Sequence, residues 1–273
     1  MRWRDQRQSG NIEDRRGMGR GVALGGGGIG VLILAAIVCL LGGDPRQLLE
    51  GGLPQDVQPP TASNSTNKPP DENRQFASAI LASTEDAWKE ILPAQTRRNY
   101  REPVLVLFDG QVSSACGRAD ASMGPFYCPG DQKLYLDFAF FRELATEFKA
   151  QGDFAQAYVV AHEVGHHVQN LLGTMAKVQA QGQNNQLSVA LELQADCYAG
   201  IWANHAEKRG QVEVGDVDEA LRAAASVGDD MIQRRTQGFV VPESFTHGSA
   251  EQRQRAFAVG MKFGNMQQCE VFK

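Results

Sequence analysis

The sequence lacks a composition dominated by Ser, Gln or Pro, any internal repeat, and any excess of basic residues. Together with a hydrophobic content of 42%, these absences exclude a disordered chain, a collagen-like repeat and a polytopic membrane protein. The formal net charge of −5 argues against nucleic acid as a partner, because nucleic-acid binders usually present a basic surface. A CxxC pattern is also absent, so a thiol redox motif or a zinc ribbon has no support.

The charge that is present is unevenly distributed. Residues 1–20 contain six Arg against three acidic residues, a net charge of +3, which leaves −8 for the rest of the chain. A basic N-terminal segment followed by an acidic body indicates that the two parts have different roles.

Residues 21–43 are 23 consecutive uncharged residues. As a helix they would extend about 34 Å, enough to cross a hydrocarbon core of about 30 Å, so they predict one transmembrane helix in a lipid bilayer. A cleaved signal peptide or a buried core helix fits less well, because the cleavage site is poor and four consecutive glycines are rare in a core helix. The excess of Arg before the span favours a single-pass protein of the bacterial inner membrane, with a cytoplasmic N-terminus (1–20) and a periplasmic C-terminal domain.

The region after this predicted span divides into a linker and a globular domain. Residues 44–74 are rich in Pro, Ser and Asn, which is typical of a linker, and residues 75–273 are long enough for one core. In an oxidising compartment we expect the disulfides Cys116–Cys128 and Cys197–Cys269, because Gly and Pro between the first two cysteines suit a short closed loop. Four small buried thiols are the alternative.

Strands precede helices in this predicted domain. Apolar runs bounded by turn residues predict a strand at 104–108 and two more on either side of a turn at 129–131. Helical periodicity predicts a helix that begins at Thr84 or earlier and ends at Pro93, followed by helices at 138–150, 154–172, 186–208, 216–235 and 249–263. This order of elements describes an α+β domain.

The segment His162-Glu163-Val164-Gly165-His166 lies within one of these helices. Two imidazoles at positions i and i+4 share one helix face and can bind one metal ion, while the carboxylate of Glu163 can accept a proton from a water molecule. The residues before the motif are apolar, and two histidines without partners would be costly there. Two core histidines held by hydrogen bonds are the alternative.

A catalytic zinc ion usually has three protein ligands, and the metzincin pattern with a third histidine close downstream is absent. Glu192 and Asp196 on the next predicted helix are four residues apart and face the same way. We assign Glu192 to the metal and Asp196 to the free N–H of a liganding imidazole, with an ordinary pair of solvated acids as the alternative. His167 is expected about 100° around the helix from His166, at the surface or behind the ligands.

Three segments resemble the bacterial neutral zinc metallopeptidase family of YpfJ-like proteins: His162–His167, Glu192–Gly200 and Thr246–Arg253. The opening residues and the single predicted span also match, so the resemblance covers nearly the whole chain. It implies a zincin-like fold and a gluzincin-type site, with Glu192 as the third zinc ligand and Asp196 behind a ligand histidine. The last segment is also similar to the Thr-His-Pro…Arg stretch of membrane-embedded HtpX-like peptidases, but Gly248 replaces the proline, so their substrate and topology do not carry over.

The sequence thus predicts a membrane-anchored zinc peptidase. His162, His166 and Glu192 are expected to hold one zinc ion, and Glu163 to act as the general base on an activated water molecule. The expected partner besides the bilayer is a peptide or protein substrate. No nucleic-acid partner is expected.

Two further residues and one strand are candidates for substrate contacts. His247 could donate a hydrogen bond to the tetrahedral oxyanion, and Arg253 could hold that loop or contact a substrate carbonyl. A capping His and a surface Arg at a helix start are the alternatives. Residues 134–136 are a candidate edge strand with which an extended substrate could pair.

Two other functions fit the same motif. A membrane-tethered binding or scaffold protein would use zinc only to join two helices, and another zinc-dependent hydrolase, such as an amidase or esterase, would use the same ligands. Glu163 favours an enzyme, because a purely structural zinc site has no need for an acid between its histidines.

Overall fold

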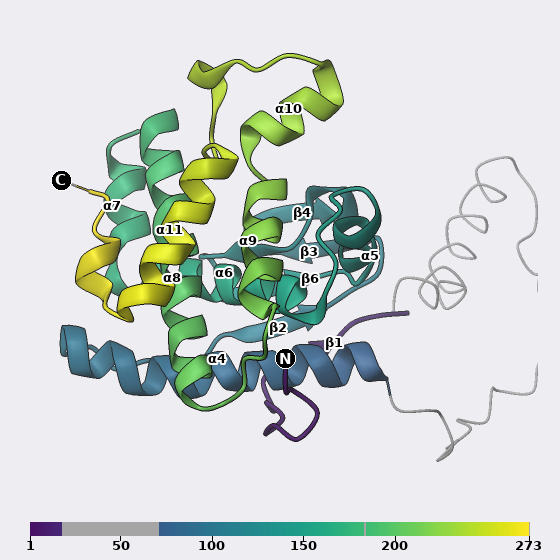
Figure 1. Ribbon diagram of the computed structural model, residues 1–273, viewed down its shortest axis with the longest axis vertical. Helices are drawn as coiled ribbons and strands as arrows, with labels where there is room; N and C mark the ends of the chain where they lie inside the picture. Colours follow the sequence, from purple (N-terminus) through teal and green to yellow (C-terminus); the bar gives the residue numbers. More distant parts are fainter. Residues whose placement is uncertain (18–70, 183, 273) are drawn as a thin grey trace, which may run out of the picture. The chain divides into compact units, whose positions relative to one another are not determined.

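The structure, a computed structural model, describes residues 1–17, 71–182 and 184–272. Within these ranges, Met1–Arg15 and Asp71–Lys273 form one α+β unit in which a small sheet and several helices share a hydrophobic core (Figure 1). Across the same ranges, no helix is both long and apolar enough to cross a membrane. The predicted α+β domain is therefore present, but the structure gives no support for a transmembrane helix before it. The predicted span at 21–43 lies outside the described residues.

Four short strands form the main sheet in the order β1-β2-β6-β5. The central strands β2 (Val104–Leu107) and β6 (Lys133–Leu136) are parallel, and their apolar runs are buried, as expected for strands covered on both faces. Strand β1 (Ile12–Asp14) pairs in parallel with β2, and β5 (Phe126–Cys128) pairs antiparallel with β6. The prediction that residues 134–136 form an edge strand is therefore wrong: they are central, and β5 is the edge on that side.

A separate hairpin precedes β5. Its strands β3 (Gln111–Ser114) and β4 (Gly117–Asp120) were not predicted from the sequence. The disulfide Cys116–Cys128 connects the hairpin turn to β5. The disulfide Cys197–Cys269 connects helix α8 (Asn185–Lys208) to the 3₁₀ turn Met266–Cys269. The structure therefore contains both expected pairs.

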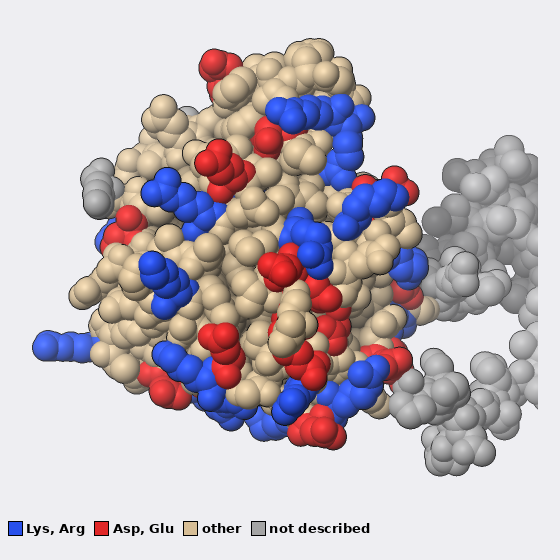
Figure 2. Space-filling view, viewed as in Figure 1, with Lys and Arg blue, Asp and Glu red and all other residues tan. Residues whose placement is uncertain are grey.

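The basic N-terminal segment, residues 1–15, packs into the unit. Trp3 is 5% exposed, and its ring meets that of Phe76 edge to face at 5.4 Å between centroids. The segment's arginines pair with acids of the domain: Arg2 with Glu213, Arg4 with Glu72, and Arg7 with Glu85 and Asp86. Figure 2 shows basic and acidic side chains interleaved along the lower edge, where α4 (Glu72–Thr96) and the N-terminus lie.

These contacts explain the uneven charge, because the basic segment binds the acidic domain within one folded unit. The buried carboxylate of Glu85, for example, accepts hydrogen bonds from Arg7, Ser9 and Asn11. Because β1 pairs with β2, the N-terminal segment and the domain lie on the same side of any membrane. The predicted arrangement, with a cytoplasmic N-terminus and a periplasmic domain, does not fit this pairing.

The helices lie near the predicted positions, but α7 (Thr174–Ala180) was not predicted from the sequence, and the first helix, α4, continues past its predicted end at Pro93 to Thr96. After α4 come α5 (Ala139–Thr146), α6 (Asp153–Leu172), α7 (Thr174–Ala180), α8 (Asn185–Lys208), α9 (Asp216–Ser226), α10 (Asp229–Gln237) and α11 (Ala250–Phe263), with 3₁₀ turns at Ala121–Met123, Pro242–Ser244 and Met266–Cys269. Helix α4 begins inside the predicted linker, where Asp71 caps it by accepting from the Arg74 backbone N–H. The predicted helix 216–235 is two helices, because Gly228 is extended and packs against the start of α11.

Close contacts between helices position the metal-binding motif. A Cβ atom added to Gly165 of α6 would lie 2.8 Å from the carbonyl oxygen of Ala195 on α8. On the other side of α8, a Cβ atom on Gly260 of α11 would overlap the carbonyl oxygen of Cys197. Only glycine permits these approaches, and they bring the functional faces of α6, α8 and α11 together.

Candidate metal centre

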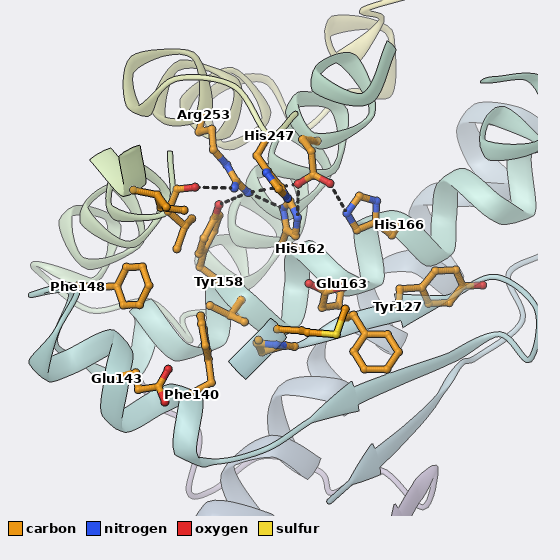
Figure 3. A pocket seen from close by; sticks show the side chains of 18 of the residues that line it. Tyr127, Phe140, Glu143, Phe148, Tyr158, His162, Glu163, His166, His247 and Arg253 are labelled. Atoms are coloured by element: carbon orange, nitrogen blue, oxygen red, sulfur yellow. Dashed lines mark hydrogen bonds and ion pairs between the residues drawn. The ribbon is translucent and has the colours of Figure 1, made fainter. Parts of the chain in front are cut away.

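Three side chains meet between α6 and α8. His162 and His166 project from one face of α6 toward the same space (Figure 3), and Glu192 reaches them from α8. Nε2 of His162 lies 3.2 Å from one carboxylate oxygen of Glu192, and Nε2 of His166 lies 3.3 Å from the other. One ligand atom from each residue falls within 4.8 Å of the other two. The structure thus brings the predicted ligand set together as a candidate metal site.

Hydrogen bonds to the opposite ring nitrogens orient both imidazoles. Nδ1 of His162 donates to Asp196 at 2.8 Å, as the four-residue spacing predicted, and Nδ1 of His166 donates to Oε1 of Gln169 at 2.9 Å. Gln169 is itself oriented, because its Nε2 donates to the backbone oxygen of Leu191 at 2.7 Å. With a proton held on each Nδ1, each Nε2 faces the centre, where a metal ion can take the place of its proton.

The electrostatics of this cluster favour a cation. Burial by itself lowers the pKa of His162, but the carboxylates of Asp196 and Glu192 outweigh it and raise this pKa to about 10. Burial likewise opposes the charge of His166, and Glu192 raises its pKa. Burial raises the pKa of Glu192, but His166 and His162 hold it well below its usual value. Two nitrogens and a carboxylate that stabilise positive charge between them are a suitable donor set for zinc.

A buried arginine holds the carboxylate behind His162. Arg253 is 4% exposed and donates to Asp196 from Nε at 2.8 Å and from Nη2 at 3.0 Å. The hydroxyl of Tyr158 also donates to Asp196, at 2.5 Å. Arg253 is therefore not a surface residue; it lines the cavity and orients His162 through Asp196.

Glu163 lies beside the candidate ligands in a cavity of about 810 Å³. Its side chain points into the same space as His162 and His166 (Figure 3), and the residue is 8% exposed. Burial raises the pKa of Glu163, which makes its carboxylate a stronger base than an exposed one.

His247 lines the same cavity, near His162 and Arg253 (Figure 3), and is held by Asp229 at the start of α10. Oδ2 of Asp229 accepts the backbone N–H groups of Thr246, His247 and Gly248 at 2.7, 2.6 and 3.0 Å, and Oδ1 lies 3.1 Å from Nδ1 of His247. The hydrogen bond that His247 donates to Asp229 raises the pKa of His247, even though burial opposes this. With Nδ1–H directed at Asp229, the protonated ring lines the cavity with an Nε2–H that no described residue accepts, so this group can donate to a substrate.

His167 was predicted at the surface or behind the ligands; it is fully buried, so the surface alternative is wrong. Its ring contacts Tyr127 of β5 and the backbone oxygen of Arg101. Burial lowers the pKa of His167 to about 4, so this imidazole stays neutral near pH 7.

Four functional side chains were missed by sequence reasoning: Tyr127, Tyr158, Gln169 and Asp229. Tyr158 lies one helical turn before His162, and Gln169 lies three residues after His166, so helical spacing could have indicated both. Asp229 and Tyr127 come from distant elements, and no local pattern marks them.

One family and several known proteins are similar to most or all of this chain. The family described as "Putative neutral zinc metallopeptidase" matches residues 1–272. An Escherichia coli K12 protein, "Uncharacterized protein YpfJ", is 44% identical over 286 residues that cover 100% of this chain and 99% of that protein. A Mycobacterium tuberculosis protein, "Uncharacterized protein Rv2575", is 46% identical over 217 residues that cover 74% of this chain and 72% of that protein. No solved structure matches the chain, so comparison adds no support for the predicted zincin-like fold.

Proposed function

The chain belongs to this family of zinc metallopeptidases, and we propose that it hydrolyses peptide bonds with one zinc ion held by His162, His166 and Glu192. The observation that carries the proposal is the convergence of these three side chains beside Glu163 at the wall of a large cavity. A purely structural site would not require a buried acid in that position.

A zinc ion bound here would polarise the scissile carbonyl and lower the pKa of a water molecule. Glu163 is placed to accept the proton of that water and to pass it to the leaving amine, and its raised pKa suits both transfers. Asp196 keeps the proton on Nδ1 of His162 and so keeps the ring in the orientation that faces the centre.

His247 is placed to stabilise the negative charge that develops on the carbonyl oxygen. It lines the cavity that contains His162, and Asp229 favours its doubly protonated form. Removing one such donor from an enzyme commonly costs about 2.7–4 kcal/mol of barrier. Arg253 supports the reaction indirectly, by holding Asp196.

The edge strand β5 supports binding of an extended chain. Phe126 and Tyr127 line the same cavity as His162 and His166. Within the described residues β5 pairs only with β6, so its outer backbone groups can pair with a peptide. The proposed substrate is therefore an unfolded or loop segment of a peptide or protein.

The test is zinc-dependent cleavage. Full-length protein stripped with a chelator is reloaded with one equivalent of zinc, incubated with a diverse peptide mixture, and the new chain ends are sequenced. New ends that depend on zinc support the proposal. Protein that retains one zinc ion and yet produces no new ends refutes it, and hydrolysis of ester or amide probes by the same sample would then identify another zinc hydrolase.

A further inference from the structure

Two consecutive histidines of α6 face two different parts of the site. His166 faces Glu192, whereas His167, which is 0% exposed, faces Tyr127 in the edge strand β5. Successive residues on a helix point about 100° apart, so one backbone segment contacts both the metal centre and the strand. The spacing between the two is therefore set by neighbouring positions of one rigid helix.

The contacts of His167 determine which atom donates to which. Nε2 lies 2.6 Å from the backbone oxygen of Arg101, and because that oxygen can only accept, Nε2 carries the ring proton. Nδ1 is then an acceptor, and the hydroxyl of Tyr127 donates to it at 3.1 Å. One turn along α6, Nδ2 of Asn170 donates to the same hydroxyl oxygen at 2.9 Å. We call Tyr127, His167 and Asn170 the strand latch.

The strand that this latch holds is short and is the edge of the sheet. Strand β5 pairs with β6 over only three residue pairs, from Phe126↔Tyr135 to Cys128↔Lys133. The Cys116–Cys128 disulfide joins the strand to the hairpin, and the latch attaches it to α6, where Tyr127 is 8% exposed. Without the latch, the three-residue strand could shift relative to the metal centre.

We propose that the strand latch sets the position of β5 relative to the metal centre, so that a peptide paired with β5 presents its scissile carbonyl to Glu163 and the zinc ligands. Tyr127, His167 and Asn170 are thus positioning residues. This inference rests on the proposed peptidase function and specifies how the enzyme binds its substrate: through backbone pairing with a strand whose placement is fixed by the residue after a metal ligand.

The proposal predicts an effect that depends on substrate length. Tyr127→Phe keeps the ring and removes the hydroxyl that joins β5 to α6. For a peptide of about ten residues, long enough to pair with β5, KM should rise about fivefold, which is the effect of one ordinary hydrogen bond. For a blocked dipeptide amide, too short to pair with the strand, kcat and KM should stay within about twofold of wild type. Zinc content should be unchanged.

Tyr100 supplies the matched control. Its ring packs on the same imidazole at 5.7 Å between centroids, but its buried hydroxyl has no hydrogen-bond partner in the described part of the chain. Tyr100→Phe should therefore leave the kinetics of both substrates unchanged. Asn170→Ala should reproduce the long-peptide effect of Tyr127→Phe, and the double variant should be less than additive because both changes weaken the same attachment.

Each outcome either supports or refutes the proposed role of the strand latch. A rise in KM for the long peptide alone supports the strand latch. Equal losses for both substrates, or a loss of zinc, would show that Tyr127 serves general stability, and unchanged kinetics for both would show that the hydroxyl positions nothing. If the zinc-loaded wild type cleaves neither peptide, the proposed function fails first, and the latch fails with it.

Discussion

The clearest structural prediction concerns the N-terminal segment. Trp3 is 5% exposed, and it packs against Phe76 of α4, which in turn meets Phe141 of α5 at 6.2 Å between ring centroids. Truncating a buried tryptophan to alanine costs about 3–5 kcal/mol. For a unit of this size 1 kcal/mol corresponds to about 2–4 °C, so Trp3→Ala should lower Tm by about 6–20 °C. Thermal unfolding followed by circular dichroism, at matched zinc content, measures the shift.

Arg4 is the control for this substitution. Its guanidinium lies over the Trp3 ring at 4.5 Å and pairs with Glu72, but its side chain is 68% exposed. An exposed pair of this kind contributes little, so Arg4→Ala should lower Tm by about 2 °C or less. If Trp3→Ala behaves like Arg4→Ala, the N-terminal segment is not part of the folded unit, and the conclusion that segment and domain share one side of a membrane is lost.

Three further predictions concern the site. Glu192→Ala should lower zinc affinity at least about tenfold, measured by competition with a chelator, and unchanged affinity would move the third ligand elsewhere. Asp229 raises the pKa of His247, so the imidazolium persists to higher pH. Asp229→Asn should therefore shift the alkaline limb of the kcat/KM profile to lower pH. An unchanged alkaline limb would exclude His247 as the titrating donor. Gly165→Ala places a methyl group against the carbonyl of Ala195, so it should separate α6 from α8 and reduce both Tm and bound zinc. A wild-type Tm together with a wild-type zinc content would contradict the close packing.

The centre itself was predictable because its geometry is local. Two pairs, His162 with His166 and Glu192 with Asp196, each span one helical turn, and helix geometry alone places each pair on one face. The remaining step, that the two faces meet, depends on the close approach at Gly165, for which the sequence offered only the glycine itself.

Other features depended on contacts between distant residues and were not predictable. The arginines of residues 1–15 fit a membrane-topology signal as well as an ion-paired interface, and Glu85, the partner of Arg7, lies 78 residues away along the chain. The order of strands in the sheet decides which one is the edge, and an apolar pattern does not contain that order. The burial of His167 likewise depends on Tyr127, which a strand brings to it from 40 residues away.

One measurement tests the central claim most directly: zinc content and peptide cleavage of Glu163→Gln, with Glu143→Gln as the control. Glu143 lines the same cavity but lies on α5, outside the candidate metal centre. The proposed mechanism predicts that Glu163→Gln binds one zinc ion as tightly as wild type and loses at least about a hundredfold in kcat, whereas Glu143→Gln retains both. A Glu163→Gln variant that holds zinc and cleaves peptides at the wild-type rate would contradict the assignment of Glu163 as the general base.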